Sequence, residues 1–253
     1  MVELTQDPLG LTTNGSSLLL AGASGLVGQA VVAQWVARSV ARSVAQSVPQ
    51  SAAQSVAQSR GPGTLHLLVR RALPVPGEHC RVHVLDFTAL PALPPAEAAL
   101  CALGTTIKTA GSQAAFRAVD FDAVWSFAQA AKAAGVQRLA VVSALGADPR
   151  SASFYNRVKG EMEAAVAALD FETLLIARPS LLTGNRAALG QPERRLEHLA
   201  MQLSAPLSFL VPAAWRPIAA ETVARALLRG LAQARPGVHI LDNAALHEQG
   251  KPP

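Results

Sequence analysis

The sequence predicts a doubly wound α/β fold, a single Rossmann-type domain in which helices cover both faces of a parallel sheet. Short apolar runs alternate with alanine-rich runs of helical period, and a glycine-rich turn follows the first apolar run. The 253 residues, half of them hydrophobic and 15% charged, can bury one large core and are not the composition of a disordered chain. We therefore expect one domain over residues 1–253.

Strands are expected where short apolar runs are bounded by turn residues, and helices where alanine-rich runs have a period near 3.6. The expected strands are residues 17–21, 64–69, 82–85, 98–103, 138–143, 173–177 and 238–241. The expected helices are residues 26–36, 114–134, 155–169, 193–203 and 220–232. Strands that are apolar throughout indicate a sheet buried on both faces.

The first strand leads into AGASGLVG, the turn predicted to bind a dinucleotide. It has the spacing G-x-x-G-x-x-G and precedes a helix. Glycine allows a tight turn, close approach of the backbone to a pyrophosphate, and close packing of helix on sheet. The alternative is an ordinary strand–helix turn. The predicted cofactor contacts in this segment are Gly22, Ser24, Gly25, Leu26, Val27 and Gly28.

Residues 37–60 interrupt the pattern with six tetrads, ARSV-ARSV-AQSV-PQSA-AQSV-AQSR. A period of four approximates a helical turn, so the preceding helix can extend as far as Pro49, which cannot continue it. We interpret the tract as a low-complexity insertion, and a partner-binding arm is the alternative. The tract supplies +3 of the formal net charge of +5, so the remaining 229 residues carry only +2.

The second expected strand ends in Arg70 and Arg71, which bear on the choice of cofactor. The residue that reads the ribose lies about 20 residues after the glycines in dinucleotide folds. Gly28 and Arg70 are 42 positions apart, or 18 without the 24-residue tract. A guanidinium pairs with the 2′-phosphate of NADP(H), so NADP(H) is preferred over NAD(H). Two solvated arginines are the alternative.

Two further segments follow strands and are expected to contact the cofactor, because such sheets bind ligands at their carboxyl ends. Asp86 and Phe87 would border the adenine. Leu103, Gly104, Thr105 and Thr106 would lie along the ribose and phosphates.

Tyr155, the one tyrosine of the chain, and Lys159 form Y-x-x-x-K, which on a helix places both side chains on one face. A phenol with a pKa near 10 is a poor base at neutral pH, and the neighbouring ammonium is expected to lower that pKa. Tyr155 then becomes a usable acid/base, and Ser143 at the end of a strand could hydrogen-bond a substrate carbonyl. A surface Tyr/Lys pair and an ordinary strand-end serine are the alternative.

These motifs resemble the short-chain dehydrogenase/reductase superfamily, with the glycine spacing of its extended and atypical branches. More closely, CALGTTIKTAGSQAAFRAVDFD, VVSALGADPRSASFYNRVKGEMEAAV, ARPSLLTGNR and LDNAALHEQGK are similar to the NAD(P)H-binding, Tat-interacting-protein-like branch of atypical members. The resemblance covers the chain except the tetrad tract and the N-terminal dozen residues. It implies a Rossmann domain that binds NADPH.

The resemblance also implies residue roles. Tyr155 would be the proton donor, Lys159 would contact the nicotinamide ribose and Ser143 the substrate. Pro179 and Leu181 would lie beside the nicotinamide. Where many relatives keep a catalytic asparagine, this chain offers Asp120.

The predicted function is an NADPH-dependent reductase of a carbonyl or related small molecule, with residues 180–217 forming a substrate lid. The alternative is an NADP(H)-binding redox sensor without turnover. Only 4% of residues are aromatic, too few for a surface on which nucleic-acid bases could stack, so no nucleic-acid partner is expected. Alanine-rich helix faces pack as well within a subunit as between subunits, so the sequence is compatible with a monomer and with a homodimer.

Cysteine usage and the N-terminal segment bear on metal binding and location. Cys80 and Cys101 form no disulfide framework, and His79, Cys80 and His83 lack a second cluster of ligands, so no metal is expected. Glycines and polar side chains interrupt the uncharged run 11–37, which argues against a membrane span, and early acidic residues argue against a signal peptide. A cytoplasmic protein is expected.

Overall fold

The computed structural model describes residues 17–46, 63–184, 212–233 and 235–252. Its long strands lie within two residues of the predicted bounds, because continuous apolar runs mark buried strands clearly. They are β1 (Leu18–Ala21), β2 (Leu65–Val69), β3 (Cys80–Val84), β4 (Ala98–Cys101), β5 (Arg138–Val142), β6 (Thr173–Ala177) and β9 (Gly237–Leu241). Two short strands, β7 (Leu182–Thr183) and β8 (Ile218–Ala219), were not predicted because two residues carry no periodic signal.

The helices agree with the predicted pattern where they are long. They are α1 (Leu26–Gln46), α2 (Ile107–Ala110), α3 (Gln113–Arg117), α4 (Ala123–Ala133), α5 (Phe154–Ala167), α7 (Ala220–Gln233) and α8 (Asn243–Gln249), with a 3-10 turn η5 (Ala213–Trp215). The helix predicted over 114–134 is divided by a π-helical turn, η2 (Ala118–Asp122). The short α2 and α8 were not predicted, and the helix predicted over 193–203 lies outside the described residues.

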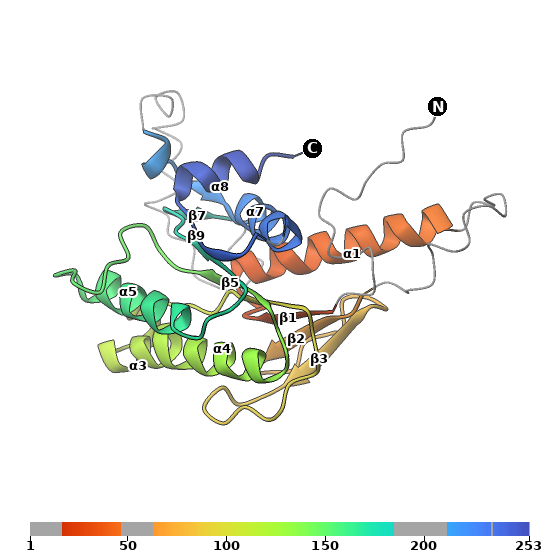
Figure 1. The fold of residues 1–253 in the computed structure, drawn as a ribbon, viewed down its shortest axis with the longest axis horizontal. Helices are drawn as coiled ribbons and strands as arrows, with labels where there is room; N and C mark the ends of the chain where they lie inside the picture. Colours follow the sequence, from red (N-terminus) through yellow and green to blue (C-terminus); the bar gives the residue numbers. More distant parts are fainter. Residues whose placement is uncertain (1–16, 47–62, 185–211, 234, 253) are drawn as a thin grey trace.

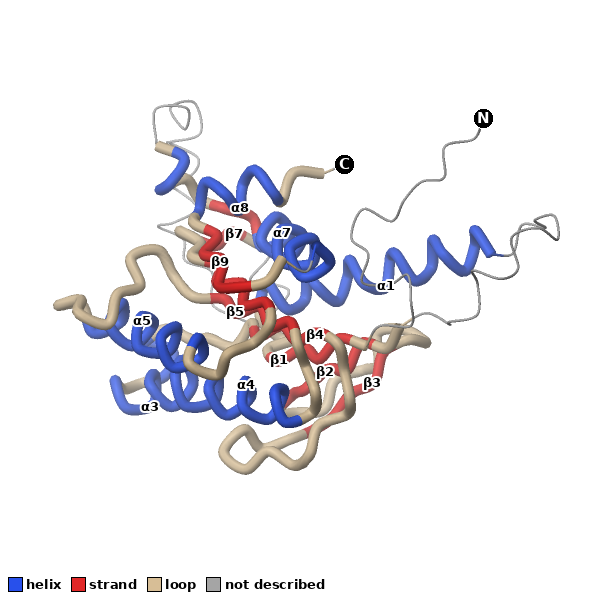
Figure 2. Tube along the Cα trace, in the orientation of Figure 1, coloured by secondary structure: helices blue, strands red, loops and turns tan. Residues whose placement is uncertain are grey.

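The sheet confirms the doubly wound α/β fold. All seven long strands are parallel, in the order β3-β2-β1-β4-β5-β6-β9, and helices lie on both faces (Figures 1 and 2). The strand order reverses between β1 and β4, the position at which such sheets bind nucleotides. The strands β7 and β8 form a separate parallel pair.

Alternate side chains of β1 enter two different cores. Leu18 and Leu20 belong to the cluster that includes side chains of α1 and α7, whereas Leu19 and Ala21 belong to the cluster that includes side chains of α4 and α5. Because successive strand residues point to opposite faces, a strand covered by helices on both sides must be apolar at every position. This requirement explains the continuous apolar runs on which the strand predictions rest.

The helix α1 continues into the tetrad tract as far as Gln46, as its Ala, Gln and Arg content favours. Trp35 is fully buried in the core, and Gln34 Nε2 donates to the backbone oxygen of Glu221 in α7 at 2.9 Å. Beyond these contacts α1 extends past the sheet (Figure 1). Residues 47–60 lie outside the described part of the chain, so the insertion stays a prediction.

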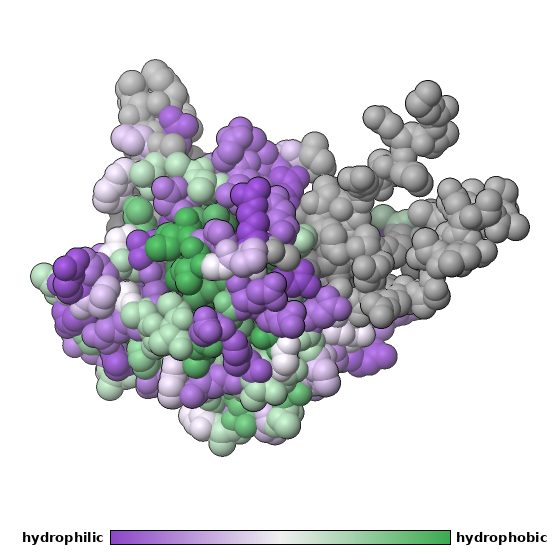
Figure 3. Space-filling view, in the orientation of Figure 1, coloured by the Kyte–Doolittle hydropathy of each residue, from purple (hydrophilic) through white to green (hydrophobic). Residues whose placement is uncertain are grey.

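The strand β9 forms one end of the sheet and carries exposed apolar side chains. Val238 is 54% exposed and Ile240 is 50% exposed. Hydrophobic atoms gather over this part of the molecule within a largely hydrophilic surface (Figure 3). Within the described ranges, no helix combines the length and hydrophobicity that a membrane span requires.

The histidines near β3 pair with each other. His66 Nδ1 lies 3.0 Å from His83 Nε2 across β2 and β3, and burial, His83 and Arg81 together lower the pKa of His66. In the described residues, no three His, Cys, Asp or Glu side chains are grouped so that they could hold a metal ion.

Candidate functional site

The residues that follow the central strands lie along one edge of the sheet. Ala21 in β1 is the register partner of Leu68 in β2 and of Cys101 in β4. The row continues from Cys101 to Val141 in β5 and Ile176 in β6. The predicted site residues that follow these strands are therefore neighbours at the carboxyl edge: Gly22, Arg70, Gly104, Ser143 and Pro179.

The glycine turn between β1 and α1 holds three backbone segments so close together that a side chain would not fit. Gly22 has φ +87°, and a Cβ added there would lie 2.5 Å from the carbonyl of Ala102. A Cβ on Gly28 would lie 2.1 Å from the Gly22 oxygen. At Gly25 the nearest atom would be 3.4 Å away, which is ordinary contact. The turn thus packs its backbone at Gly22 against the segment that follows β4. At Gly25 a side chain would meet no backbone atom at less than ordinary contact distance.

The other predicted contacts in this turn differ in accessibility. Ser24 is exposed and Leu26 is half-buried, whereas Val27 is 4% exposed and packs in the core. The first N–H groups of a helix have no intrahelical partner, so the start of α1 offers donors to an anion. The backbone here fits a pyrophosphate, with Gly25 as the position of closest approach.

The two arginines after β2 are exposed and make no ion pair or hydrogen bond with another described residue. Arg70 directly follows Val69, and β2 is the neighbour of β1 in the sheet, so the backbone of Arg70 and Arg71 leaves the sheet next to the strand that leads into the glycine turn. A free pair of cations at this place fits a 2′-phosphate. Which cofactor they select stays a prediction.

The segment after β3 contains the two residues that are predicted to border the adenine. Asp86 is exposed, and its hydrogen bonds with Thr88 lower the pKa of its carboxyl. The Phe87 ring is 4% exposed and belongs to the core cluster that contains Leu68 and Leu93. The Phe87 ring is thus part of the core, and the border of the adenine by Asp86 and Phe87 stays a prediction.

The segment after β4 passes over a buried ion pair. A Cβ on Gly104 would lie 3.4 Å from Asp120 Oδ1 and 3.7 Å from Lys159 Nζ, so the absence of a side chain leaves this pair close to the open edge. Thr105 donates its backbone N–H to Asp120 Oδ2 at 2.8 Å. Thr106 accepts a hydrogen bond from the Thr109 N–H and begins α2, and Leu103 is half-buried.

Lys159 of α5 lies at the centre of the site. Its Nζ is 2.7 Å from Asp120 Oδ1 and 3.5 Å from the backbone oxygen of Val142, which ends β5. Burial disfavours the ammonium, but Asp120, Tyr155 and Cys101 outweigh burial, so the pKa of Lys159 is raised. Burial also raises the pKa of the Asp120 carboxyl against the lowering by Lys159. Asp120 Oδ2 accepts the Thr105 N–H, and Oδ1 forms an ion pair with the Lys159 ammonium.

Tyr155 lies one helical turn before Lys159 and packs its ring on the buried Phe116 ring, with centroids 5.2 Å apart. Burial has the largest effect on its pKa and raises it, while Lys159 lowers it and Asp120 raises it again. The net shift is upward. Lys159 lowers the pKa of Tyr155 as expected, but the expected net lowering is wrong, because burial and the Asp120 charge outweigh the ammonium.

Ser143 directly follows Val142, the last residue of β5, whose backbone oxygen lies 3.5 Å from Lys159 Nζ. Its N–H donates to the Ala177 oxygen at 2.7 Å, which continues the strand pairing with β6. The side chain is 5% exposed, and its Oγ has no hydrogen-bond partner among the described residues. A buried hydroxyl without a partner costs free energy, which a ligand with a carbonyl oxygen would recover.

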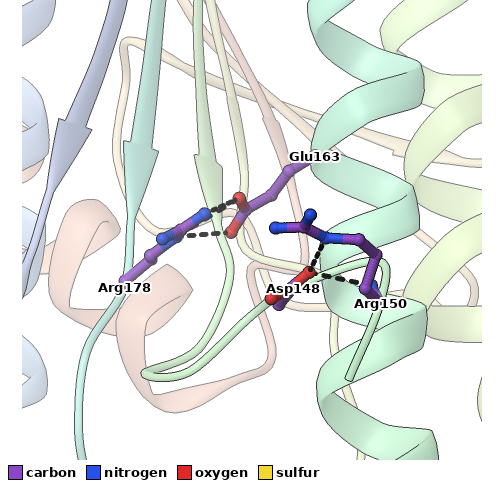
Figure 4. A network of polar contacts seen from close by, with 4 residues as sticks. All are labelled: Asp148, Arg150, Glu163 and Arg178. Carbon is purple, nitrogen blue, oxygen red and sulfur yellow. Dashed lines mark hydrogen bonds and ion pairs between the residues drawn. The ribbon is translucent and has the colours of Figure 1, made fainter. Parts of the chain in front are cut away.

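The loop after β5 is held against α5, a contact that the sequence did not predict. A Cβ on Gly160 would lie 2.2 Å from the Pro149 nitrogen, so only glycine after Lys159 permits this approach. Figure 4 shows Asp148 and Arg150 of the loop near the Glu163 and Arg178 pair. Arg178 Nη2 lies 2.5 Å from Glu163 Oε2, and these contacts raise the pKa of Arg178. The pair joins α5 to the end of β6.

The segment after β6 is fixed by the buried Asn243 of α8. Asn243 Oδ1 accepts the Ser180 N–H at 2.9 Å, and its Nδ2 donates to the Arg216 oxygen at 2.9 Å. A Cβ on Gly184 would lie 2.9 Å from Leu26 Cδ2, so this segment reaches the start of α1. Asn243 of α8 thereby hydrogen-bonds the backbone near both ends of the predicted lid segment.

Of the residues predicted beside the nicotinamide, Pro179 is buried and Leu181 is 38% exposed. Trp215 is 66% exposed at the other end of the lid segment. Residues 185–211 lie outside the described part of the chain, so the lid stays a prediction.

Comparison with solved structures supports the fold. The structure of MoeE5 in complex with UDP-glucose and NAD has a TM-score of 0.62 and 16% identity, over 89% of this chain and 75% of that chain. The ADP-L-glycero-D-manno-heptose-6-epimerase of Helicobacter pylori has a TM-score of 0.61 and 13% identity, over 94% of this chain and 78% of that chain. At these identities the likeness concerns the fold alone.

Shorter similarities correct the expected location. Protein FMP52, mitochondrial, of Coccidioides immitis is 46% identical over 84 residues, which are 33% of this chain and 34% of that protein. Further FMP52 proteins, such as that of Debaryomyces hansenii, are also named as mitochondrial. The expectation of a cytoplasmic protein is therefore wrong as an inference from the sequence. The absence of a basic N-terminal signal for secretion does not distinguish the cytoplasm from an organelle.

A longer similarity connects the chain with a curated protein. No protein-family model matches the chain. Protein HTATIP2 of Rattus norvegicus is 36% identical over 176 residues, which are 66% of this chain and 69% of that protein. The sequence motifs, the sheet order and this match agree. The chain belongs to the HTATIP2 family, the Tat-interacting-protein-like branch of the atypical short-chain dehydrogenases/reductases.

Proposed function

We propose that the chain is an NADPH-dependent reductase of a carbonyl or related small molecule. The observation that carries this proposal is the position of Lys159, one helical turn after Tyr155, with its Nζ 3.5 Å from the backbone oxygen of Val142, the residue directly before Ser143. Ser143 presents a buried hydroxyl without a partner, and Tyr155 presents a phenol. A hydrogen-bond donor and an acid at one place suit the reduction of a C=O group.

The residues at the edge fit a nicotinamide dinucleotide. The helix start at Leu26 and the bare backbone at Gly22 and Gly25 suit the pyrophosphate, and Arg70 and Arg71 suit a 2′-phosphate. MoeE5, whose fold is similar, is in complex with NAD. When bound, NADPH supplies the hydride for the reduction.

The chain's own groups then have separate roles. Ser143 Oγ donates to the substrate oxygen and polarises the carbonyl. Tyr155 gives its phenolic proton to that oxygen as negative charge develops there. Lys159, held by Asp120 and the Val142 oxygen, has a remaining donor that would hold the nicotinamide ribose.

Replacement of Arg70 by glutamate tests the cofactor preference. In titrations followed by calorimetry, the wild type is expected to bind NADPH more tightly than NADH. Arg70→Glu removes a cation from the 2′-phosphate and adds a repelling charge, so it should weaken NADPH binding about tenfold to a hundredfold and leave NADH binding little changed. Measurement at two salt concentrations checks that the effect is electrostatic.

Lys251→Glu is the matched control, because it makes the same change of net charge at an exposed position after α8. It should bind both cofactors as the wild type does. Equal affinities for NADPH and NADH that Arg70→Glu does not alter would contradict the NADP(H) assignment. Binding of NADPH without turnover of any carbonyl in a broad panel would contradict the reductase and favour a sensor.

A further inference from the structure

Asp120 is placed inside the site by an irregular helix. It lies in the π-helical turn η2 between α3 and α4, and its side chain is 1% exposed. π-turns insert an extra residue into a helix and often occur at functional sites. Here the turn directs a carboxylate inward, toward the end of β4 and toward α5.

Both oxygens of Asp120 are used. The Oδ2 atom accepts the Thr105 N–H at 2.8 Å, which fixes the carboxylate relative to the segment that follows β4. The Oδ1 atom lies 2.7 Å from Lys159 Nζ, whose side chain is 4% exposed. The ion pair is therefore shielded from water. A backbone donor on one oxygen and the ammonium on the other hold the carboxylate in one orientation.

The pair changes the field at the neighbouring phenol. The charged and titratable groups that act on Tyr155 are Lys159 from its own helix and Asp120 from η2. Cys101 of β4 interacts with both members of the pair, but burial raises the pKa of its thiol to about 12, so it is uncharged at neutral pH. Phe116 adds an apolar ring. A Lys159 ammonium alone would favour the phenolate, whereas an ion pair has no net charge to do so.

We propose, on the basis of the reductase function above, that Asp120 is a positioning residue that cancels the charge of Lys159 and so holds Tyr155 in the protonated form that carbonyl reduction requires. In reduction, the carbonyl carbon gains a hydride from the reduced nicotinamide, the π-electron pair of C=O moves to oxygen, and that oxygen takes the Tyr155 proton. In the reverse oxidation, the phenolate must accept the alcohol proton. A phenol that stays protonated therefore serves the first direction.

The single tyrosine of the chain permits a direct test. The ultraviolet absorbance of phenolate reports Tyr155 alone when the protein is titrated with base, with no substrate needed. In the wild type the midpoint should lie above that of a free phenol. Asp120→Asn leaves the Lys159 charge uncancelled, and the midpoint should fall by roughly one to three pH units. Asp122→Asn, at an exposed position of the same turn, should leave the midpoint unchanged.

A second set of variants decides the case if Asp120→Asn does not fold. Lys159→Gln leaves the Asp120 charge alone near the phenol and should raise the midpoint above the wild type. The double variant Asp120→Asn/Lys159→Gln has no charge at either position and should return close to the wild type. Circular dichroism at each pH checks that the protein is folded. The proposal is overturned if Asp120→Asn does not lower the midpoint, or if the single and double Lys159 variants coincide.

The kinetic outcome separates this proposal from the reductase function. Once a substrate is found that the protein reduces, Asp120→Asn should raise the rate of the reverse alcohol oxidation at neutral pH. The pH dependence of that rate should shift toward acid. A structural role alone would lower both directions without moving the profile. If no substrate is turned over but Asp120→Asn lowers the Tyr155 midpoint, the reductase function fails and the electrostatic role of Asp120 stands.

Discussion

Gly28→Ala is expected to leave little folded protein. A Cβ at this position would lie 2.1 Å from the Gly22 oxygen and 2.8 Å from the Ala23 Cα, and both obstacles are backbone atoms that cannot rotate away. The start of α1 would have to move off the sheet and separate the buried Val27 and Val31 from the core. We expect a loss of at least about 3 kcal/mol in the free energy of unfolding, measured with urea.

Gly25→Ala is the matched control for this change. Its Cβ would meet nothing closer than the Gly22 oxygen at 3.4 Å, so stability should stay within about 1 kcal/mol of the wild type. The same methyl group stands where the pyrophosphate would approach the backbone, so NADPH binding should still weaken. Equal stability of the two variants would contradict the close packing of the turn. Unchanged NADPH affinity of Gly25→Ala would contradict the predicted phosphate site.

Tyr155→Phe is expected to lower kcat by roughly a hundredfold to ten-thousandfold, because it removes the proton donor. The ring still packs on Phe116, so folding and NADPH binding should change little. The measurement is NADPH oxidation with a carbonyl substrate, together with calorimetric binding. Because no other tyrosine exists in the chain, residual activity in this variant cannot come from a second phenol.

Lys159→Ala should behave differently from Tyr155→Phe. It would remove the proposed contact to the nicotinamide ribose and leave the Asp120 carboxylate buried without its ammonium, so binding and turnover should both weaken. If Tyr155→Phe turns over substrate at the wild-type rate, Tyr155 is not the acid. If Lys159→Ala binds NADPH as the wild type does, Lys159 does not hold the ribose.

The sheet and the glycine turn could be predicted because each has a local signal. Strands buried on both faces are apolar at every position, as Leu18 to Ala21 are, and a helix shows its period over many residues. The number of residues between Gly28 and Arg70 agrees with the spacing of a dinucleotide fold only when the 24 residues of the repeat are left out. The structure accounts for that subtraction in part, since α1 simply continues into the repeat.

The environment of the catalytic groups could not be predicted, because it depends on contacts between distant segments. The sequence places Lys159 near Tyr155, but it does not show that Asp120 pairs with Lys159 or that Phe116 covers the phenol. Those contacts reverse the expected direction of the Tyr155 pKa shift. Asp120 stands within the predicted helix 114–134, where nothing in the helical pattern indicates a π-turn.

The lid attachments were missed for a similar reason. Asn243 is one polar residue in the C-terminal segment LDNAALHEQGK, and no spacing rule connects it with Ser180 and Arg216. Gly160 and Gly184 are needed for close approach to other segments, but each is a single glycine without a turn motif. A buried polar residue or glycine can be interpreted only when its neighbours in space are known.

The structure of the protein in complex with NADPH is the most direct test of the central claim, that the carboxyl edge of the sheet is a nicotinamide-dinucleotide site. The account predicts the pyrophosphate over the backbone of Ser24 to Leu26, the 2′-phosphate at Arg70 or Arg71, and the nicotinamide beside Ser143 and Tyr155. A cofactor bound away from the glycine turn, or a nicotinamide out of reach of Tyr155, would contradict it.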